Sequence, residues 1–317
     1  MRQALQAITE ELRRLKTAGV KTVAVSDETM AALREAIGAR GAKPDNRMRE
    51  PTKSPQPNVG SPVSASPAKP YEPPPPVTRA AVVANPAAGL APIPATAPTV
   101  VLPAGDKTAR WTALKDLVLK DATCVAHVRP GKKVVLGVGS LDAKIMFVGE
   151  APGAEEEIQG EPFVGPAGQL LTKMIQAMGL KREDVYIGNI MNWRPEMPTA
   201  PGAAQVGNRP PTEEEMRYCL PYLRAQIEVV NPELLVALGS TAAQGLLGFG
   251  SFKALGDIRG RWHEFAGKPL MISYHPSYIL RNQSNRSKRM IWEDLLKVME
   301  RAGLPISEKQ RGFFLDK

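Results

Sequence analysis

The sequence predicts an α/β fold, a three-layer α/β/α sandwich with a central, mostly parallel four-stranded sheet. After residue 140, four short apolar runs read as strands, and segments long enough to be helices separate them. Strands that are joined through helices pair in parallel and carry helices on both faces of the sheet. Three of the runs end in loops with distinctive polar or glycine residues, which predicts a ligand cleft beyond the carboxyl ends of the strands.

Each element is predicted from its own pattern. An amphipathic helix is expected at 111–120, before the sheet, because its apolar residues fall on one face. The strands are expected at 144–148, 185–190, 234–237 and 270–273, where apolar residues dominate. The helices between and after them are expected at 167–178, 212–230, 240–247 and 287–302.

The chain before this region divides into two parts. Residues 1–40 are expected to form a small helix–strand–helix unit of unknown role, which is too small to bury much core. A protein partner and a marginally stable extension are both open for it. Residues 41–105 hold roughly half of the 30 prolines and predict a Pro-rich disordered linker. Residues 106–305 are expected to form the folded domain, and 306–317 a C-terminal tail.

Composition favours an intracellular protein that meets a polyanion. The net charge of +9 and the pI near 9.5 suit such a partner. No apolar run is long enough to cross a bilayer, and charges interrupt the amino-terminal segment where a signal peptide would lie. Two cysteines form no disulfide framework. We therefore expect a cytoplasmic protein with no membrane contact.

The first distinctive loop follows the expected strand at 144–148. It contains GEAPG at 149–153 and GEPFVGPAGQLL at 160–171. Glycines let the main chain approach a flat ring, and Phe163 offers such a ring a stacking surface. The loop favours a planar heterocycle as ligand, and a tight turn with a buried phenylalanine is the alternative.

A second distinctive loop follows the expected strand at 270–273 and carries His275 before Pro-Ser. Two bulky apolar residues come next, Ile279 and Leu280. A cationic run follows, comprising Arg281, Arg286, Lys288 and Arg289. These features predict a base-flipping site, in which the histidine donates to an extruded base, the apolar pair fills the gap and the cations hold phosphates. A capping histidine beside a solvated basic loop is the alternative.

Six segments between residues 122 and 302 resemble one family in order and spacing. They are GEAPG, GEPFVGPAGQLL, VYIGNIMNWRP with Asn189, PTEEEMRYCLPYL, LLVALGSTA, and YHPSYILRN with WEDL after it. The family they resemble is the bacterial family-four uracil-DNA glycosylases. The resemblance implies a DNA repair enzyme that binds uracil-containing DNA, flips the uracil and hydrolyses its N-glycosidic bond, leaving an abasic site.

The resemblance also implies catalytic roles. Phe163 is expected to stack on the flipped base, Asn189 to read the edge of uracil, and His275 to stabilise the uracil anion as a neutral donor. Better-known uracil glycosylases have an aspartate where this chain has Ala151, so Glu150 is the first candidate for placing water or stabilising the sugar cation. The expected catalytic residues are His275, Asn189 and Glu150.

Other residues are expected to line the site. Glu156 is expected to crowd the pyrimidine 5-position and reject thymine, whereas Glu155 and Glu157 are as readily a solvated acidic helix start. The expected substrate-binding residues are Gly149, Ala151, Pro152, Gly153, Glu156, Phe163, Asn189 and His275. The expected DNA-binding residues are Ser277, Ile279, Leu280, Arg281, Arg286 and Lys288. Arg194 and Arg209, around a Gly/Pro-rich loop, are read either as phosphate contacts or as part of a surface loop.

The chain departs from the family at the metal site. Members of the family usually carry four cysteines that bind a 4Fe-4S cluster. Cys124 and Cys219 match two of those positions, and His127 and Trp193 occupy the other two. Because tryptophan cannot ligate iron, we expect no cofactor and no metal. A 4Fe-4S cluster held by the two cysteines, the histidine and an outside ligand is the alternative.

The sequence leaves two other functions open. A non-catalytic module that binds uracil or single-stranded DNA would keep the base pocket, and Ala151 gives this reading some support. A relative that traps DNA covalently through histidine would have an arginine-rich insertion, which YHPSYILRN lacks.

Overall fold

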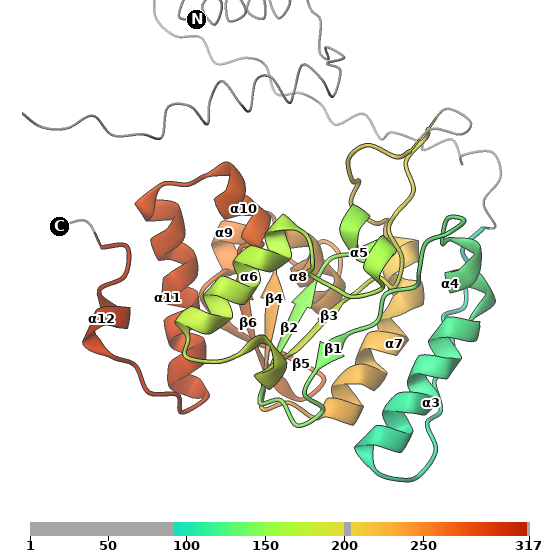
Figure 1. Ribbon diagram of the computed structural model, residues 1–317, viewed down its shortest axis with the longest axis horizontal. Helices are drawn as coiled ribbons and strands as arrows, with labels where there is room; N and C mark the ends of the chain where they lie inside the picture. Colours follow the sequence, from blue (N-terminus) through green and yellow to red (C-terminus); the bar gives the residue numbers. More distant parts are fainter. Residues whose placement is uncertain (1–91, 200–203, 316–317) are drawn as a thin grey trace, which may run out of the picture. The chain divides into compact units, whose positions relative to one another are not determined.

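The structure is a computed structural model that describes residues 92–199 and 204–315. The expected unit at 1–40 and most of the expected linker lie outside the described residues. A six-stranded sheet with the order β1-β3-β2-β4-β6-β5 forms the centre of the described part (Figure 1). Its four inner strands run parallel to one another. The predicted α/β class and parallel sheet are therefore confirmed.

The inner strands are the four that the apolar runs predicted. They are β2 (Ile145–Gly149), β3 (Tyr186–Asn189), β4 (Leu234–Leu238) and β6 (Lys268–Ser273). The expected count of four strands is wrong, because two antiparallel edge strands are added, β1 (Val138–Gly139) and β5 (Trp262–Phe265). With two and four residues, these edges are too short to produce a pattern that the sequence alone would reveal.

Helices cover both faces of the sheet and make the three layers. The helices that come before and between the first strands are α3 (Lys107–Lys120), α4 (Ala122–Ala126), α5 (Ala154–Gln159), α6 (Pro166–Ala177) and the 3-10 turn η1 (Arg182–Asp184). Those that follow β3 are α7 (Glu213–Val230), α8 (Ser240–Leu247), α9 (Leu255–Ile258), α10 (Pro276–Arg281), α11 (Asn285–Arg301) and α12 (Glu308–Arg311). No helix in the described ranges is long and apolar enough to span a membrane.

Alternate residues of each strand enter two different cores. In β2, Met146 and Val148 belong to the core with α3, α7 and α8, whereas Ile145 and Phe147 belong to the core with α6 and α11. This division follows from the period of two along a strand, and burial on both faces explains why the runs are continuously apolar.

Both expected boundaries of the folded domain need correction. The expected linker at 41–105 extends too far, because Ile93, Val100 and Leu102 pack against the core that α3 and α7 share. The expected tail at 306–317 contains α12, and Trp292 Nε1 donates to the Gln310 carbonyl at 2.6 Å. Phe313 packs on the same tryptophan, with ring centroids 5.3 Å apart. Apolar residues at both ends therefore extend the folded region.

Candidate active site

The carboxyl ends of β2, β3 and β6 deliver three predicted residues to one cavity of ≈ 610 Å³. Gly149 ends β2 and is paired with Asn189 at the end of β3. A Cβ atom at Gly149 would lie 2.4 Å from Asn189 Oδ1 and 2.5 Å from the Phe163 ring. The ring centroids of Phe163 and His275 are 5.5 Å apart. The aromatic ring, the carboxamide and the imidazole are therefore close enough together to touch one small planar ligand.

The Asn189 carboxamide is the most informative group in this cavity. Its side chain is buried, and Oδ1 has no hydrogen-bond partner in the described part of the chain. A buried acceptor without a donor costs roughly 1–3 kcal/mol, so such groups normally serve a ligand or an ordered water. Asn189 is thus held ready to accept a hydrogen bond from a molecule in the cavity.

Phe163 is held in place by strained and tightly packed backbone. Its φ of 55° lies in the left-handed region, which non-glycine residues rarely adopt. Gly168 passes directly beneath it, since a Cβ there would lie 1.8 Å from the Phe163 carbonyl oxygen. Arg182 Nη2 donates to the Pro162 carbonyl at 2.6 Å. The ring is therefore fixed at the cavity wall before any ligand arrives.

Glu156 fastens the same loop from the other side. Its Oε2 accepts from Gly153 N at 3.0 Å, and its Oε1 accepts from Val164 N at 3.0 Å and Gly165 N at 2.9 Å. The carboxylate thus joins the loop after β2 to the amino terminus of α6. We expected Glu156 to face the pyrimidine 5-position, and the structure commits both of its oxygens to backbone donors. Glu156 borders the cavity and shapes it by holding these two loops.

His275 both caps α10 and lines the cavity. Its Nδ1 accepts from Ser277 N at 3.2 Å and lies 2.8 Å from Ser277 Oγ. An Nδ1 that accepts a backbone N–H carries no hydrogen, so the neutral ring has its hydrogen on Nε2. Burial, assisted by the charge of Arg281, lowers the pKa of His275 to about 4. The expected neutral donor and the capping histidine are therefore the same residue.

Glu150 follows the end of β2 and borders the cavity. Burial raises the pKa of its carboxyl, and a hydrogen bond with Thr241 opposes that rise. Thr241 belongs to the first turn of α8, after Gly239, whose Cβ would lie 3.1 Å from His275 Cβ. Sequence reasoning missed Gly239, Ser240 and Thr241 as cavity residues, although LLVALGSTA contains them. A glycine directly after a buried strand was the available signal.

A buried carboxylate anchors the end of β6. Asp294 of α11 accepts from Ser273 Oγ at 2.7 Å and pairs with Arg259 at 2.7 Å. Burial raises the pKa of Asp294, and its hydrogen bonds with Arg259 and Ser273 oppose that rise. Ser273 is two residues before His275, so this pairing fixes the strand from which the histidine loop departs.

Comparison with known families agrees with this geometry. Residues 136–296 match the model of the uracil DNA glycosylase superfamily. This chain belongs to that superfamily. Within it, a type-4 uracil-DNA glycosylase of Thermotoga maritima is 42% identical over 185 residues, which are 58% of this chain and 90% of the relative. A type-4 enzyme of Pyrobaculum aerophilum is 38% identical over 181 residues, 55% of this chain and 87% of the relative. The expected resemblance to the family-four uracil-DNA glycosylases is confirmed.

Of the predicted DNA-binding residues on α10 of this superfamily member, three lie at the surface or the cavity and one is buried in the core. Ser277 and Arg281 border the cavity, and Leu280 is 41% exposed beside them. Ile279 was expected beside Leu280 in the gap of the base stack, and this expectation is wrong. It is 7% exposed and packs in the core with α11. Successive residues of a helix point about 100° apart, so Leu280 can face outward while Ile279 faces the core.

The basic residues at the start of α11 also differ in what they contact. Arg286 is exposed and Lys288 is half-buried, so both remain candidates for phosphate contacts. Arg289 donates instead to Glu293 and to the carbonyls of Arg311 and Phe313. It holds the carboxyl-terminal segment against α11.

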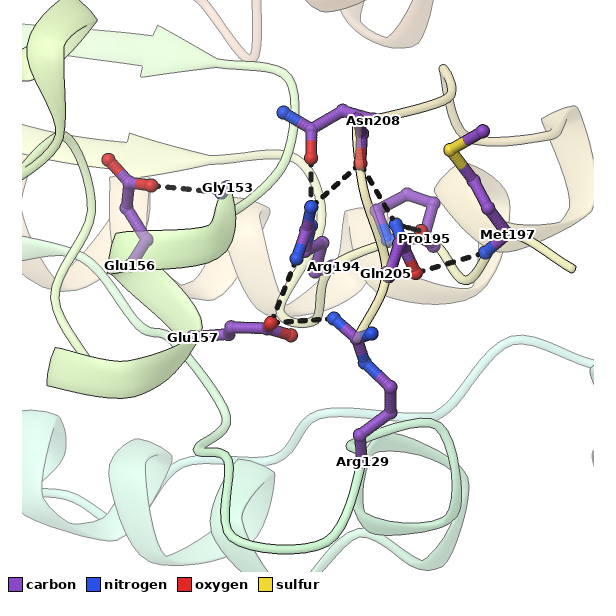
Figure 2. A network of polar contacts seen from close by, with 10 residues as sticks. Arg129, Gly153, Glu156, Glu157, Arg194, Pro195, Met197, Gln205 and Asn208 are labelled. Carbon is purple, nitrogen blue, oxygen red and sulfur yellow. Dashed lines mark hydrogen bonds and ion pairs between the residues drawn. The ribbon is translucent and has the colours of Figure 1, made fainter. Parts of the chain in front are cut away.

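The loop between β3 and α7 forms another wall of the glycosylase cavity. Figure 2 shows the polar network that supports this loop. Glu157 pairs with Arg129 at 2.6 Å and with Arg194 at 2.9 Å. Glu157 is 5% exposed, so the reading of this residue as a solvated helix start is wrong. Arg209 forms a bidentate salt bridge with Glu215, with one hydrogen bond to each carboxylate oxygen. Arg194 and Arg209, expected as phosphate contacts or surface residues, are both engaged within the protein.

The four positions at which the family resemblance places cluster ligands do come together. Trp193 stacks on His127 with ring centroids 5.1 Å apart and planes 16° apart. Cys124 and Cys219 are fully buried, and their mutual hydrogen bond, followed by burial, raises the pKa of the Cys124 thiol. In the described ranges, no group of three or more ligating side chains is placed to hold a metal ion. These residues do not fit a 4Fe-4S cluster.

Proposed function

We propose that this chain removes uracil from DNA by hydrolysing the N-glycosidic bond after base flipping, and that it leaves an abasic site. One observation carries the proposal. The unpaired Oδ1 of Asn189 lies close to the ring of Phe163, and that ring lies beside the imidazole of His275, in a cavity at the ends of parallel strands. That set suits a planar base with alternating donors and acceptors on its edge.

The charges that develop in this reaction explain the residue types. As the bond between C1′ and N1 breaks, positive charge grows on the deoxyribose and negative charge on uracil. A neutral His275 can donate its Nε2 hydrogen to a uracil oxygen and stabilise the anion. Water adds its hydroxyl to C1′, and the proton released from that water passes to the uracil anion, directly or through solvent. Glu150, beside the cavity, is the candidate that positions the water or stabilises the cation.

Selection of uracil falls to Asn189. Uracil presents a carbonyl acceptor at O4 and a hydrogen on N3, and a carboxamide can donate to the first while accepting from the second. Cytosine presents the reverse pattern at both atoms. A site with fixed polar groups discriminates strongly against a mismatched edge, because its own buried groups would stay unpaired. Phe163 supplies the stacking face for the base.

Leu280 and the surrounding polar residues are proposed to hold the distorted DNA. An exposed apolar residue beside the cavity can fill the space that the flipped base leaves. Ser277 and Arg281 border the same cavity, where they can reach the phosphates next to that nucleotide.

The chain is also proposed to work without an iron–sulfur cluster. The residues at the cluster positions support this, because Trp193, which cannot ligate iron, packs on His127 where ligands would be required. As-purified protein is expected to contain no stoichiometric iron and to show no absorbance shoulder near ~400 nm, where such clusters absorb. Iron in a fixed ratio to protein, together with that shoulder, would contradict this part of the proposal.

A uracil-containing oligonucleotide tests the activity directly. Incubation with the full chain, followed by alkali and a denaturing gel, is expected to produce strand cleavage at the uracil and none at thymine. A shifted native band without base loss would indicate a binding module. A denaturant-resistant adduct would indicate covalent trapping.

A further inference from the structure

We propose that Asn208 is a further substrate-contacting residue, whose side-chain NH₂ donates to an acceptor oxygen of the bound DNA. The acceptor is either a phosphate oxygen or a base carbonyl. This inference rests on the proposed function, because Asn208 borders the same cavity as Phe163, Asn189 and His275. The reasons lie in the loop that carries it, between β3 and α7.

The loop forms a built wall of the cavity. Pro195, Gly207, Asn208 and Arg209 all border the cavity. Gln205 is buried beneath them, accepts from Met197 N at 3.0 Å and donates to the carbonyls of Pro195 and Gly207 at 3.1 and 3.2 Å. A buried side chain thus joins the two ends of the loop, so the cavity-facing residues are held before a ligand binds.

The orientation of the Asn208 side chain follows from its partner. Arg194 Nε donates to Asn208 Oδ1 at 2.7 Å. A guanidinium can only donate, so the atom that faces it must be the amide oxygen, and the NH₂ group points the other way. Figure 2 shows this arrangement, and a Cβ at Gly153 would lie 3.8 Å from Asn208 Nδ2. Asn208 is exposed, and its NH₂ group donates to none of the described residues, so it is open to a ligand in the cavity.

Arg194 is itself immobilised. Its side chain is 4% exposed, Nη1 donates to Glu157 at 2.9 Å, and Nη2 donates to the Gly207 carbonyl at 2.7 Å. Every nitrogen of this guanidinium has a partner, and its charge is balanced by Glu157. Every nitrogen of the Arg209 guanidinium likewise donates, to Glu215 or to one of two carbonyls. Of these three loop residues, Asn208 is therefore the one whose donor nitrogen makes no hydrogen bond to the described residues, and its donors are oriented in advance at little entropic cost.

An Asn208→Asp substitution separates a structural role from a contact with DNA. The aspartate keeps the oxygen that Arg194 requires and so preserves the loop, but it removes the donor and adds a negative charge. We expect affinity for a uracil-containing oligonucleotide to fall by roughly 10-fold or more, with the melting temperature unchanged. Gln176→Glu, an exposed amide-to-acid change near the far end of α6, is the matched control for added charge and is expected to bind like the natural chain.

Two oligonucleotides distinguish the two acceptors. A duplex with a tetrahydrofuran abasic analogue lacks the base and keeps the phosphates. A phosphate contact predicts that Asn208→Asp weakens binding to both this duplex and the uracil duplex, more so at low salt. A base contact predicts that only binding to the uracil duplex is weakened.

Natural affinity of Asn208→Asp for both oligonucleotides would overturn the inference. If the aspartate disturbs folding, Asn208→Ala serves as the second variant. Unchanged affinity of Asn208→Ala for both oligonucleotides would equally overturn the inference. Failure of the proposed function is visible separately, because the natural chain would then bind uracil DNA without releasing the base, while the comparison of affinities would still report on Asn208.

Discussion

The two ring nitrogens of His275 have different tasks. Nδ1 accepts the backbone N–H of Ser277 and caps α10, which leaves the Nε2 hydrogen for a ligand in the cavity. The carboxamide of Asn189, by contrast, has an oxygen with no partner in the described structure. His275 is therefore oriented by the helix that it caps, and Asn189 has an oxygen ready to accept from a ligand.

These two residues should matter more for reaction than for binding. We expect Asn189→Ala and His275→Ala each to slow single-turnover uracil release by about 10²-fold or more, because their contacts strengthen as negative charge develops on the base. Affinity for uracil DNA, measured by fluorescence anisotropy, should change far less. His263→Ala, on edge strand β5, is the control and should release uracil at the natural rate. Near-natural rates for both site variants would refute the assigned roles.

His275 should also make folding depend on pH. Because its pKa is lowered from 6.5 to about 4, the unfolded chain binds a proton between these values that the folded chain does not. Stability that is complete above pH 6.5 is therefore lost as the pH falls towards 4, by on the order of 3 kcal/mol. Urea unfolding at about pH 7.5 and about pH 5 should show a smaller drop for His275→Gln than for the natural chain. Equal drops would contradict this account.

At the scale of single elements, α10 presents neighbouring residues to different surroundings. Ile279 packs in the core and Leu280 faces out. Ile279→Ala should lower the free energy of unfolding by about 2–4 kcal/mol through loss of buried volume. Leu280→Ala should leave urea unfolding unchanged and slow excision from duplex DNA more than from single strands, where no stack must be filled. If Ile279→Ala slowed excision from duplex DNA and Leu280→Ala lowered stability, the assignment of Leu280 as the residue that fills the stack would be wrong.

Helix α5 carries three consecutive glutamates with different tasks. Glu156 binds backbone amides, Glu157 pairs with two arginines, and Glu155 is exposed. Glu157→Gln should lower the free energy of unfolding by about 3 kcal/mol, because it leaves the buried guanidinium of Arg194 without its counter-charge. Glu155→Gln makes the same chemical change on the same helix and should be near neutral in denaturant titrations. Equal effects of the two substitutions would show that burial of the ion pair is unimportant.

At the scale of the whole molecule, the folded region begins earlier than composition predicted. Ile93, Val100 and Leu102 pack on the core, so removal of residues 1–91 should preserve both melting temperature and uracil release. Removal of residues 1–105 should lower the melting temperature, because it exposes the apolar surface that these three side chains cover. Loss of base release after removal of 1–91 alone would show that the amino-terminal part belongs to the working site.

Local patterns in the sequence were sufficient for the parallel sheet and for the central residues of the cavity. Buried parallel strands are continuously apolar over a few residues, and the loops that follow them carry ligand groups at one edge of the sheet. Phe163 and His275 stand in such loops and Asn189 ends its strand, so their convergence could be expected before any coordinates. Their roles in the reaction stay predictions.

Only the tertiary structure decided which side of an element each residue faces and which charges are paired. The edge strands, the burial of Ile279, and the pairing of Glu157 with arginines from two separate segments depend on contacts between distant parts of the chain. The same holds for the packing of Trp193 on His127 and for the cavity wall that carries Asn208. Sequence periodicity reports the environment of a residue within its own element, whereas burial and charge pairing are set by whatever packs against that element.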